Sequence, residues 1–426
     1  MHVVELPARR GETAIICAAI GRTAGRVLAA AKNTSPAVQL AAGWMTMFAI
    51  GTDLFVVSPL LPLIASGYRI SATQAGLAVT AFAAAYMVVA PVCGSLADRW
   101  GRRRVLCLGL LVFAAGNLAT AVAPAFPALL AARLLAGAAA AAVSPSVYAL
   151  VGEAAPPARR ASRLALVVSG LLLSLSVGTP LGALLGTAFG WPIVFIVLTA
   201  ASLALAAVNL RAWPAAAGGI AADAGAARLT PAVVARRTAP TVIWSTALYG
   251  MYTYLGAGLA GAGYSADATA GAIAIYGAGA LGGTFLGGAA ADRLGTRPTI
   301  GAGLFGLAVG LMLLRLGLVH GAILGVALFF VSVMAQLFFP AQQAGLARDF
   351  PARRATMLAW NNSALFFGIS LGSLVGGTAM AVAGFGTDLW AGAAIATLGW
   401  LLNGAVLPRR LGMSALKSDR DFGRHR

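Results

Sequence analysis

The sequence predicts an all-α membrane protein in which two copies of one helical unit follow each other. Hydrophobic residues make up 60% of the 426 residues and charged residues only 10%, and the mean hydropathy of +0.86 lies above the range of soluble domains. A charged motif also occurs twice, because residues 94–103 and 288–297 both read G-x-x-x-D-R-x-G-x-R. Its two aspartates are 194 positions apart (292 minus 98).

The apolar stretches of the chain divide into twelve predicted spans of roughly 20 residues, the length that crosses a bilayer. We expect two pseudo-symmetric bundles of six transmembrane helices, over residues 39–210 and 240–407, joined by a cytoplasmic linker over 211–239. Basic cytoplasmic segments over 1–38 and 408–426 flank them. The spans are predicted at 40–65, 74–96, 105–123, 126–151, 164–188, 191–210, 240–262, 268–290, 299–318, 321–346, 356–383 and 387–407.

The positive charge lies in alternate connections. Of the 30 lysines and arginines, all except Arg69, Arg133 and Arg315 fall in the N-terminal segment, in every second loop or in the C-terminal tail. This bias predicts that both termini are cytoplasmic, and it explains the net charge of +18 without a nucleic-acid partner. The high content of Ala, Gly and Arg is typical of a GC-rich bacterial genome, so we expect a multi-pass protein of the bacterial inner membrane.

The N-terminal segment permits three interpretations. Residues 15–31 are apolar, but Arg22 and Arg26 interrupt them, which excludes the hydrophobic core of a secretory signal peptide. Because Arg22 and Arg26 share one helical face, an amphipathic helix on the membrane surface is one interpretation. A segment without fixed structure and a start codon assigned too far upstream are the others.

The first span contains Asp53, which we predict to be the only acidic residue inside the spans. About twelve residues at 1.5 Å each place it roughly 18 Å deep, near the midplane of the bilayer. A charged carboxylate there costs about 2.5 to 3.5 kcal/mol. Asp53 is therefore a candidate proton carrier. The alternative is a carboxylate satisfied by Ser, Thr or backbone groups, or by a permanent ion pair.

At the inner end of the second span, the first copy of the repeated motif forms a charged hinge. Gly94 and Gly101 allow close approach and a sharp turn, and Asp98 can lie near the positive end of a neighbouring helix. Glu153, at the inner end of the fourth span, is a candidate partner for the arginines. The alternative is positive charge that only sets the topology.

The fourth and fifth spans add a charge and a bend. Arg133 is the other charge within the spans, and its approach to and separation from Asp53 could change the proton affinity of that carboxyl group. A structural ion pair explains Arg133 equally well. In the fifth span, Gly178 and Gly182 permit close helix packing and Pro180 bends the helix.

The second half repeats these features. The linker over 211–239 is rich in Ala, Gly, Pro and Arg and has no continuous apolar run. The offset of 194 also relates Gly178 to Gly372 and Gly182 to Gly376. Several landmarks in one register indicate a duplicated unit.

Together these motifs resemble those of the major facilitator superfamily, over residues 40 to 407. The motif over 94–104 is very specific for this family, whereas its second copy has Thr296 and Pro298 in place of the first and third arginines of the run. Arg133-Leu-Leu-Ala-Gly resembles the family's R-x-x-Q-G motif, which is associated with proton transfer, with Ala in place of Gln. Gly178-Thr-Pro-Leu-Gly182 resembles the antiporter motif G-x-x-x-G-P-x-x-G-G, with Thr179 between Gly and Pro.

The resemblance implies two six-helix bundles around a central cavity. Pro59-x-x-Pro62 and Ser71-x-x-Gln74 further resemble the drug:proton antiporter branch, which exports drugs and sugars. The charged hinges are expected to close the cytoplasmic gate in the outward-facing state. The expected gate residues are Gly94, Asp98, Arg99, Gly101, Arg102, Arg103, Glu153, Asp292, Arg293, Gly295 and Arg297.

The substrate cavity is expected to combine amide and aromatic side chains, which suit a neutral or amphipathic organic molecule. Tyr249 and Tyr252 share one face of the seventh span. Interfacial or helix-contact roles are the alternative for each of these residues. The expected cavity residues are Asn117, Tyr249, Tyr252, Gln336, Asn361 and Asn362.

We therefore expect a monomeric, proton-coupled secondary transporter that exports a small drug, sugar or nucleoside-like molecule by alternating access. Its partners are the substrate, protons and the lipid bilayer. The proton gradient drives it without a cofactor, a metal or ATP, since no nucleotide motif is present. The alternatives are an uptake symporter or uniporter and a membrane sensor that does not transport. An enzyme is not expected, because a nucleophile, a set of metal ligands or a carboxylate pair is lacking.

Overall fold

The computed structural model describes residues 35–156, 159–214 and 230–405. The predicted basic tail 408–426, nearly all of the N-terminal segment and the middle of the linker lie outside the described residues. The interpretations of the N-terminal segment therefore stay predictions.

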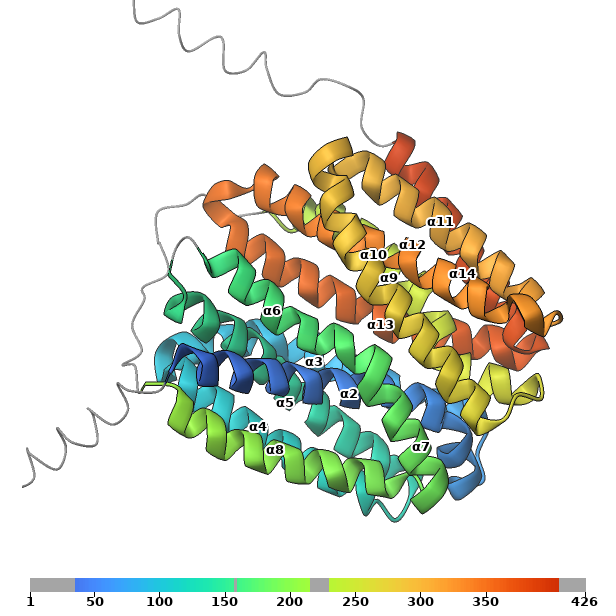
Figure 1. Cartoon of the computed structure of the whole chain (residues 1–426), viewed down its shortest axis with the longest axis horizontal. Helices are drawn as coiled ribbons and strands as arrows, with labels where there is room; N and C mark the ends of the chain where they lie inside the picture. Colours follow the sequence, from blue (N-terminus) through green and yellow to red (C-terminus); the bar gives the residue numbers. More distant parts are fainter. Residues whose placement is uncertain (1–34, 157–158, 215–229, 406–426) are drawn as a thin grey trace, which may run out of the picture.

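Long antiparallel helices form the first half of the chain (Figure 1). In one of them, α6 continues through a short π-helical segment, η2, into α7. The elements are α2 (Pro36–Tyr68), α3 (Ala72–Trp100), α4 (Arg102–Ala121), α5 (Phe126–Ala154), α6 (Arg160–Leu173), η2 (Ser174–Gly178), α7 (Thr179–Phe189) and α8 (Pro192–Ala212).

The second half has the same organisation, with one short 3₁₀ turn, η3, before its fifth long helix. Its elements are α9 (Pro231–Gly261), α10 (Ala266–Leu294), α11 (Thr296–Gly317), α12 (Gly321–Asp349), η3 (Pro351–Arg353), α13 (Arg354–Ala383) and α14 (Phe385–Ala405).

The helix boundaries repeat with the offset of the sequence motif. Helices α3 and α10 begin 194 positions apart and also end 194 positions apart. Each is followed by a glycine in the left-handed region, Gly101 with φ of 88° and Gly295 with φ of 94°. Only glycine adopts this region without steric cost, so the sharp turn is present in both copies. Ser71 and Ser265, also 194 positions apart, cap the N-termini of the two helices.

Eleven of the described helices are long and apolar enough to cross a membrane, counting the bent helix α6–η2–α7 once. Helix α9 has 31 residues and is long enough, but it is less apolar than these eleven helices. The reason is that Tyr, Thr, Ser and Gly occupy much of its length. These residues are buried in the centre of the molecule rather than exposed to lipid. With α9, the described helices match the twelve predicted spans, and the predicted all-α fold is confirmed.

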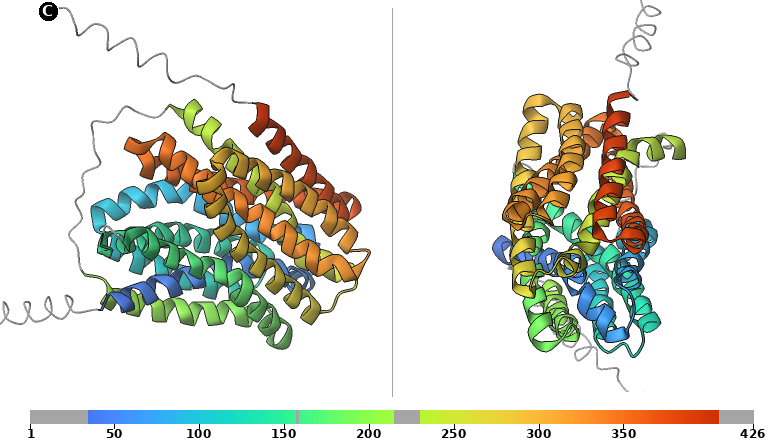
Figure 2. Two further views of the ribbon diagram at one scale, coloured as in Figure 1. Left: turned by 45° about the horizontal axis from the view of Figure 1, so that its top comes forward. Right: turned by 90° about the vertical axis from the view of Figure 1, so that its right-hand side faces the viewer.

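Helices α2–α8 and α9–α14 form two bundles that lie side by side (Figures 1 and 2). Between them, α3 packs along α13, α2 against α9, and η2 and α7 against α10. Each bundle begins and ends on the same side, which we call the terminal end, and the opposite side is the distal end. The terminal end is the predicted cytoplasmic side.

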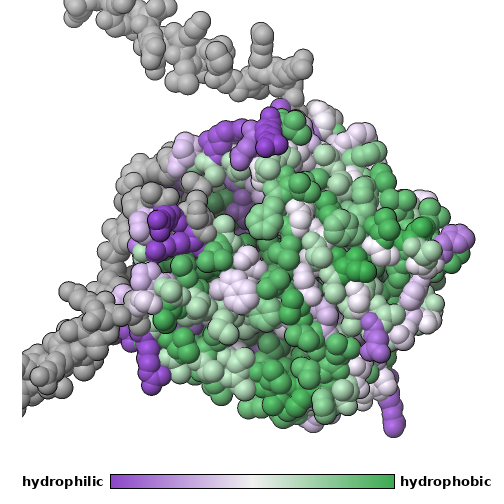
Figure 3. Space-filling view, viewed as in Figure 1, coloured by the Kyte–Doolittle hydropathy of each residue, from purple (hydrophilic) through white to green (hydrophobic). Residues whose placement is uncertain are grey.

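Apolar side chains cover the sides of the bundles, whereas polar side chains gather toward the ends (Figure 3). Phe285, Val326 and Val382 are among the exposed apolar residues, at 68%, 72% and 81%. Contact of such a surface with lipid chains is favourable, whereas its contact with water is unfavourable.

Helix α9 begins before the predicted seventh span. It starts at Pro231, whereas the apolar stretch starts at residue 240, and Pro240 lies inside the helix. Proline has no N–H group, but the first turn of a helix has no acceptor for that group. Pro231 therefore favours a helix that starts there. The right-hand view of Figure 2 shows this first part of α9 leaving the bundle sideways. The linker is therefore partly helical.

Gly101→Ala tests the predicted turn. A Cβ atom in the left-handed region costs about 1 to 2 kcal/mol, so we expect a lower midpoint of thermal unfolding in detergent. Gly152→Ala is the matched control, because nothing lies within 4 Å of a Cβ atom at that helical position. Equal midpoints for the two variants would contradict the role assigned to Gly101.

Candidate functional site

A buried ion pair joins α2 to α5. Asp53 lies at the middle of α2, and Arg133 Nη1 donates a hydrogen bond to its Oδ1 at 2.8 Å. Arg133 Nη2 also lies 3.4 Å from the backbone oxygen of Asp53. The two side chains are 0% and 1% exposed. The structure therefore brings together the two charges that the sequence places in separate spans.

Two aromatic rings enclose the guanidinium group. The Cζ atom of Arg133 lies 4.7 Å from the ring centre of Phe82 and 5.6 Å from that of Phe195, distances at which a cation is attracted to the ring face. Among the described residues, Asp53 Oδ2 and Arg133 Nε have no hydrogen-bond partner. A buried polar atom without a partner costs about 1 to 3 kcal/mol. The pair therefore keeps an acceptor and a donor for further bonding.

The glycines of the fifth span lie against the stretch of α2 that carries Asp53. A Cβ atom on any of these glycines would overlap a side chain of α2. Both partners repeat every four residues, so the helices touch along one continuous seam. The facing pairs are Gly178 with Thr52, Gly182 with Val56 and Gly186 with Leu60.

The bend of the fifth span lies at the contact between the bundles. Pro180 has no N–H group to continue the helical hydrogen bonds, and the turn before it, Ser174–Gly178, is π-helical. A Cβ atom at Gly277 of α10 would overlap the backbone of Ser176. The second bundle therefore packs directly on the bend.

Aromatic rings from both bundles meet near the molecular centre. Tyr249 stacks on Phe55 with ring centres 6.4 Å apart, and Tyr252 meets Phe55 edge-on at 5.7 Å. Ser58 donates a hydrogen bond to the backbone oxygen of Tyr252. The space between these side chains is about 10 Å³, barely enough for one water molecule. The predicted cavity residues Tyr249 and Tyr252 therefore lie in a closed contact.

Two predicted cavity amides lie on α13. Asn362 donates a hydrogen bond to the hydroxyl of Tyr86 at 3.2 Å and so joins the bundles. Tyr86 also stacks on Phe366 with ring centres 3.5 Å apart. Asn361 instead accepts a hydrogen bond from Thr241 within the second bundle, at 2.6 Å. Tyr86 was not predicted, because one tyrosine in an apolar span carries no signal of a partner.

The other two predicted cavity residues lie elsewhere. Asn117 donates to the backbone oxygen of Phe113 in its own helix, and α4 packs mainly against α5 and α8. Gln336 is buried on α12 against Gly283 of α10. Neither amide lines the small space beside Phe55, Tyr249 and Tyr252.

Asp388 is a second buried acid, so the prediction that Asp53 is the only acid inside the spans is wrong. Asp388 lies in the first turn of α14 and is 2% exposed. A Cβ atom at Gly376 of α13 would lie 2.8 Å from its Oδ1, and one at Gly250 of α9 would lie 3.1 Å from it. The predicted span 387–407 already contained Asp388, so the sequence itself contradicts that prediction.

Hydrogen bonds close the distal end between α3, α9 and α13. The Tyr254 hydroxyl donates to the backbone oxygen of Ser373 at 2.9 Å and lies 3.4 Å from that of Thr73. Thr73 donates to the backbone oxygen of Gly377, and Ser373 to that of Gly76, at 3.1 and 2.9 Å. A Cβ atom at Gly76 or Gly377 would overlap the Tyr254 hydroxyl group. This contact forms because glycines on two distant helices leave room for the Tyr254 hydroxyl group. The sequence does not show that these helices meet.

Among the residues that the structure describes, the ion pairs at the terminal end lie within a bundle. Arg102 pairs with Glu153 in the first bundle, and Arg237 pairs with Asp349 at 3.2 Å in the second. The hydrogen bonds described above that join the two bundles lie at the distal end and in the middle of the molecule. Tyr254, Thr73 and Ser373 thus link the bundles at the distal end.

The remaining predicted gate residues lie at the ends of α3 and α10 and the start of α4. Arg99 is exposed in the last turn of α3, and Arg103 is partly buried on α4. In the second copy, Asp292, Arg293 and Arg297 are exposed. Gly94 and Asp98 belong to α3, but their surroundings lie outside what the structure describes, so their roles stay predictions.

Comparisons with known proteins agree with this geometry. The family model described as Major Facilitator Superfamily matches residues 43–266 and 232–422. An "Uncharacterized MFS-type transporter YceJ" of Bacillus subtilis (strain 168) is 28% identical over 345 residues, which cover 78% of this chain and 86% of that protein. A "Chloramphenicol resistance protein" of Streptomyces lividans is 31% identical over 258 residues, covering 58% and 64%.

Solved structures share the fold. A bacterial homologue of the human lysosomal transporter Spinster, in an inward-facing and unoccupied conformation, has a TM-score of 0.74 at 17% identity, covering 89% of this chain and 99% of that chain. A D-xylose-proton symporter has a TM-score of 0.71 at 16% identity, covering 87% and 98%.

Gly182→Val tests the seam between α2 and α7. The added side chain meets Val56, and forcing extra groups into a packed contact costs about 1 to 3 kcal/mol. We expect a lower midpoint of thermal unfolding. Gly288→Val is the control, because a Cβ atom there meets nothing within 4 Å. If the two variants unfold at the same temperature, the seam is not a tight contact.

Proposed function

The chain belongs to the major facilitator superfamily, and we propose that it exports a small organic molecule in exchange for protons. It is a multi-pass membrane transporter, not an enzyme. The observation that carries the proposal is the buried pair of Asp53 and Arg133 on helices of the first bundle. A carboxyl group that deep in a membrane protein is expensive to keep charged and is expected to serve transport.

Protonation of Asp53 would remove the charge that holds Arg133. The guanidinium group would then keep the rings of Phe82 and Phe195 but lose its anionic partner. A buried charge without a partner is strongly destabilising. Protonation of Asp53 would therefore lower the stability of the arrangement in which Asp53 and Arg133 are paired, relative to one in which they are separated.

Helix α2 would carry this change to the contact between the bundles. It bears Asp53 on one side, and its Phe55 and Ser58 contact Tyr252 of α9. The glycine seam fixes α2 to α7, which packs on α10. A shift of α2 would thus reach α9 and α10 together. Alternating access requires such a coupling between the two bundles.

The aromatic contact of Phe55, Tyr249 and Tyr252 supports an amphipathic substrate, such as a drug, sugar or nucleoside-like molecule. Rings stack on flat or apolar groups, and hydroxyls fix polar ones. The chloramphenicol resistance protein among the relatives supports a drug in particular. In the closed structure these rings fill the space between the bundles, so substrate would bind when they separate.

For location, we propose the inner membrane of a bacterium, with both termini in the cytoplasm and the chain working as a monomer. The support is the Lys and Arg content of alternate loops. The distal end, which Tyr254 fastens, would then face outward. The gradient would supply about 2.3 kcal/mol per 100 mV for each charge moved inward, without any other cofactor.

Uptake by a symporter or uniporter of the same fold is the second candidate. Thr179 separates Gly178 from Pro180, which departs from the antiporter motif. The direction of coupling is therefore open to experiment.

Everted vesicles test the direction of transport, with chloramphenicol as the first probe in a panel of neutral drugs. We expect the probe to accumulate when the lumen is acidic, because protons then leave as the substrate enters. Accumulation driven by acid on the substrate's own side would overturn the export proposal.

Asp53→Asn tests the proton carrier in the same vesicles. We expect accumulation driven by the pH gradient to fall at least about tenfold, while substrate exchange without a gradient persists. Asp267→Asn, an exposed acid in the first turn of α10, is the control and should transport normally. Full gradient-driven transport by Asp53→Asn would remove Asp53 from the mechanism.

A further inference from the structure

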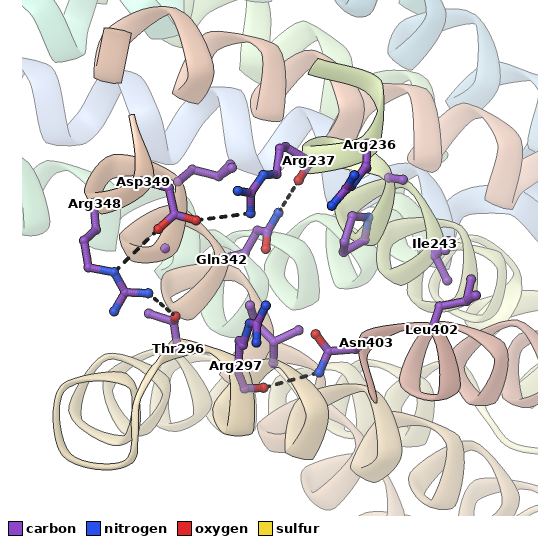
Figure 4. Close-up of a pocket in the computed structure, with 16 residues that line it drawn as sticks. Arg236, Arg237, Ile243, Thr296, Arg297, Gln342, Arg348, Asp349, Leu402 and Asn403 are labelled. Carbon is purple, nitrogen blue, oxygen red and sulfur yellow. Dashed lines mark hydrogen bonds and ion pairs between the residues drawn. The ribbon is translucent and has the colours of Figure 1, made fainter. Parts of the chain in front are cut away.

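A pocket of about 250 Å³ opens at the terminal end of the second bundle, away from the contact between the bundles (Figure 4). It lies between the starts of α9 and α11 and the ends of α12 and α14. Its charged and polar lining consists mainly of Arg236, Arg237, Arg297, Arg348, Asp349 and Gln342.

The pocket is strongly basic. Four arginines face one carboxylate, and that carboxylate is shared, because Asp349 lies 3.2 Å from Arg237 and 3.7 Å from Arg348. Among the described residues, no carboxylate lies within 4.0 Å of Arg236 or Arg297. The lining therefore carries an excess of three positive charges, which an anion would offset.

Hydrogen bonds join the four helices that line the pocket. Gln342 donates to the backbone oxygen of Arg237 at 2.9 Å, and Asn403 donates to that of Arg297 at 3.3 Å. Arg348 donates to the hydroxyl of Thr296 at 3.1 Å. Figure 4 shows these bonds around the pocket. Because these bonds already join the helices, an anion would be bound with little ordering of the backbone.

Part of the pocket lining is apolar. Pro240, Ile243, Ile300, Leu346 and Leu402 line it beside the arginines. A free inorganic ion would gain nothing from these side chains. A ligand with one anionic end and an apolar remainder would contact both parts of the pocket.

A second hollow continues the first onto the membrane-facing side of α11 and α14. The two share Arg297 and Asn403, and the second is lined by Trp400, Leu401 and Gly301. Trp400 is 39% exposed and packs on Phe305, which is 50% exposed. Arginines at the helix ends followed by an exposed aromatic surface match the order of headgroup and acyl chain in a bilayer.

We propose that this pocket binds the phosphate group of an anionic phospholipid, with the phosphate at Arg236 and Arg297 and an acyl chain along Trp400. Guanidinium groups bind phosphate oxygens in bidentate geometry, and basic pockets between membrane helices bind lipid headgroups. The bound lipid would link the start of α9 to α11 and α14. The site is separate from Asp53 and does not depend on the direction of transport.

Native mass spectrometry of the detergent-purified full chain tests the site. We would titrate it with phosphatidylglycerol, with phosphatidylcholine of the same acyl chains and with inorganic phosphate. We expect phosphatidylglycerol to bind at least about tenfold more tightly than phosphatidylcholine. Equal affinity for the two lipids would overturn the proposal.

Two variants locate the site. Arg236→Gln with Arg297→Gln should lose the preference for phosphatidylglycerol, whereas Arg315→Gln, at the distal end of α11, should keep it. Comparable thermal midpoints will show that the double variant is folded. An unchanged preference in the double variant, or an equal loss in Arg315→Gln, would overturn the assignment.

A third variant separates the lipid from free phosphate. Trp400→Ala should weaken binding of phosphatidylglycerol several-fold and leave inorganic phosphate unchanged, because only the lipid has a chain to place there. Inorganic phosphate that binds as tightly as phosphatidylglycerol, together with lipid binding that Trp400→Ala leaves unchanged, would identify a phosphate-ion site and overturn the lipid proposal.

Discussion

The structure depends on keeping one ion pair inside a membrane. Asp53 and Arg133 are both fully buried, at 0% and 1% exposure. Taking two charges out of water costs several kcal/mol each, and only close pairing and enclosure offset that cost. The enclosure comes from the rings of Phe82 and Phe195, and α2 is held in position by the glycines of the bent fifth span. The tight seams of the first bundle thus surround the pair of Asp53 and Arg133.

The two bundles share a plan but differ in their polar centres. The turn at Gly101 and the capped helix that precedes it recur 194 positions later. The second bundle has no counterpart of the ion pair, since Ala247 and Ala327 occupy the positions 194 after Asp53 and Arg133. Instead it buries Asp388 between the glycines of α9 and α13. The two halves of the duplicated scaffold therefore bury acidic groups differently, as an ion pair in the first and beside glycines in the second. In both halves, glycines allow the close helix packing around these groups.

Much of this fold could be predicted from the sequence, because apolar length and charge position act locally. The predicted span 268–290, for example, lies within α10 (Ala266–Leu294), and the turn at Gly101 follows from its motif. Contacts across the bundles could not be predicted. Tyr86, Tyr254 and Gly76 acquire partners only when two helices distant in sequence meet. The burial of Asp388 also depends on its neighbours Gly250 and Gly376, which lie on other helices. The arginine pocket likewise assembles from four separate helix ends.

The central claim is that Asp53 gains and loses a proton, and infrared spectroscopy tests it most directly. In the wild-type protein, the band of protonated carboxyl groups should grow as the pH falls. Asp53→Asn should remove one component of that band, whereas Asp388→Asn should leave that component in place. A band in Asp53→Asn identical to that of the wild type would contradict the claim, because Asp53 would then keep one protonation state throughout.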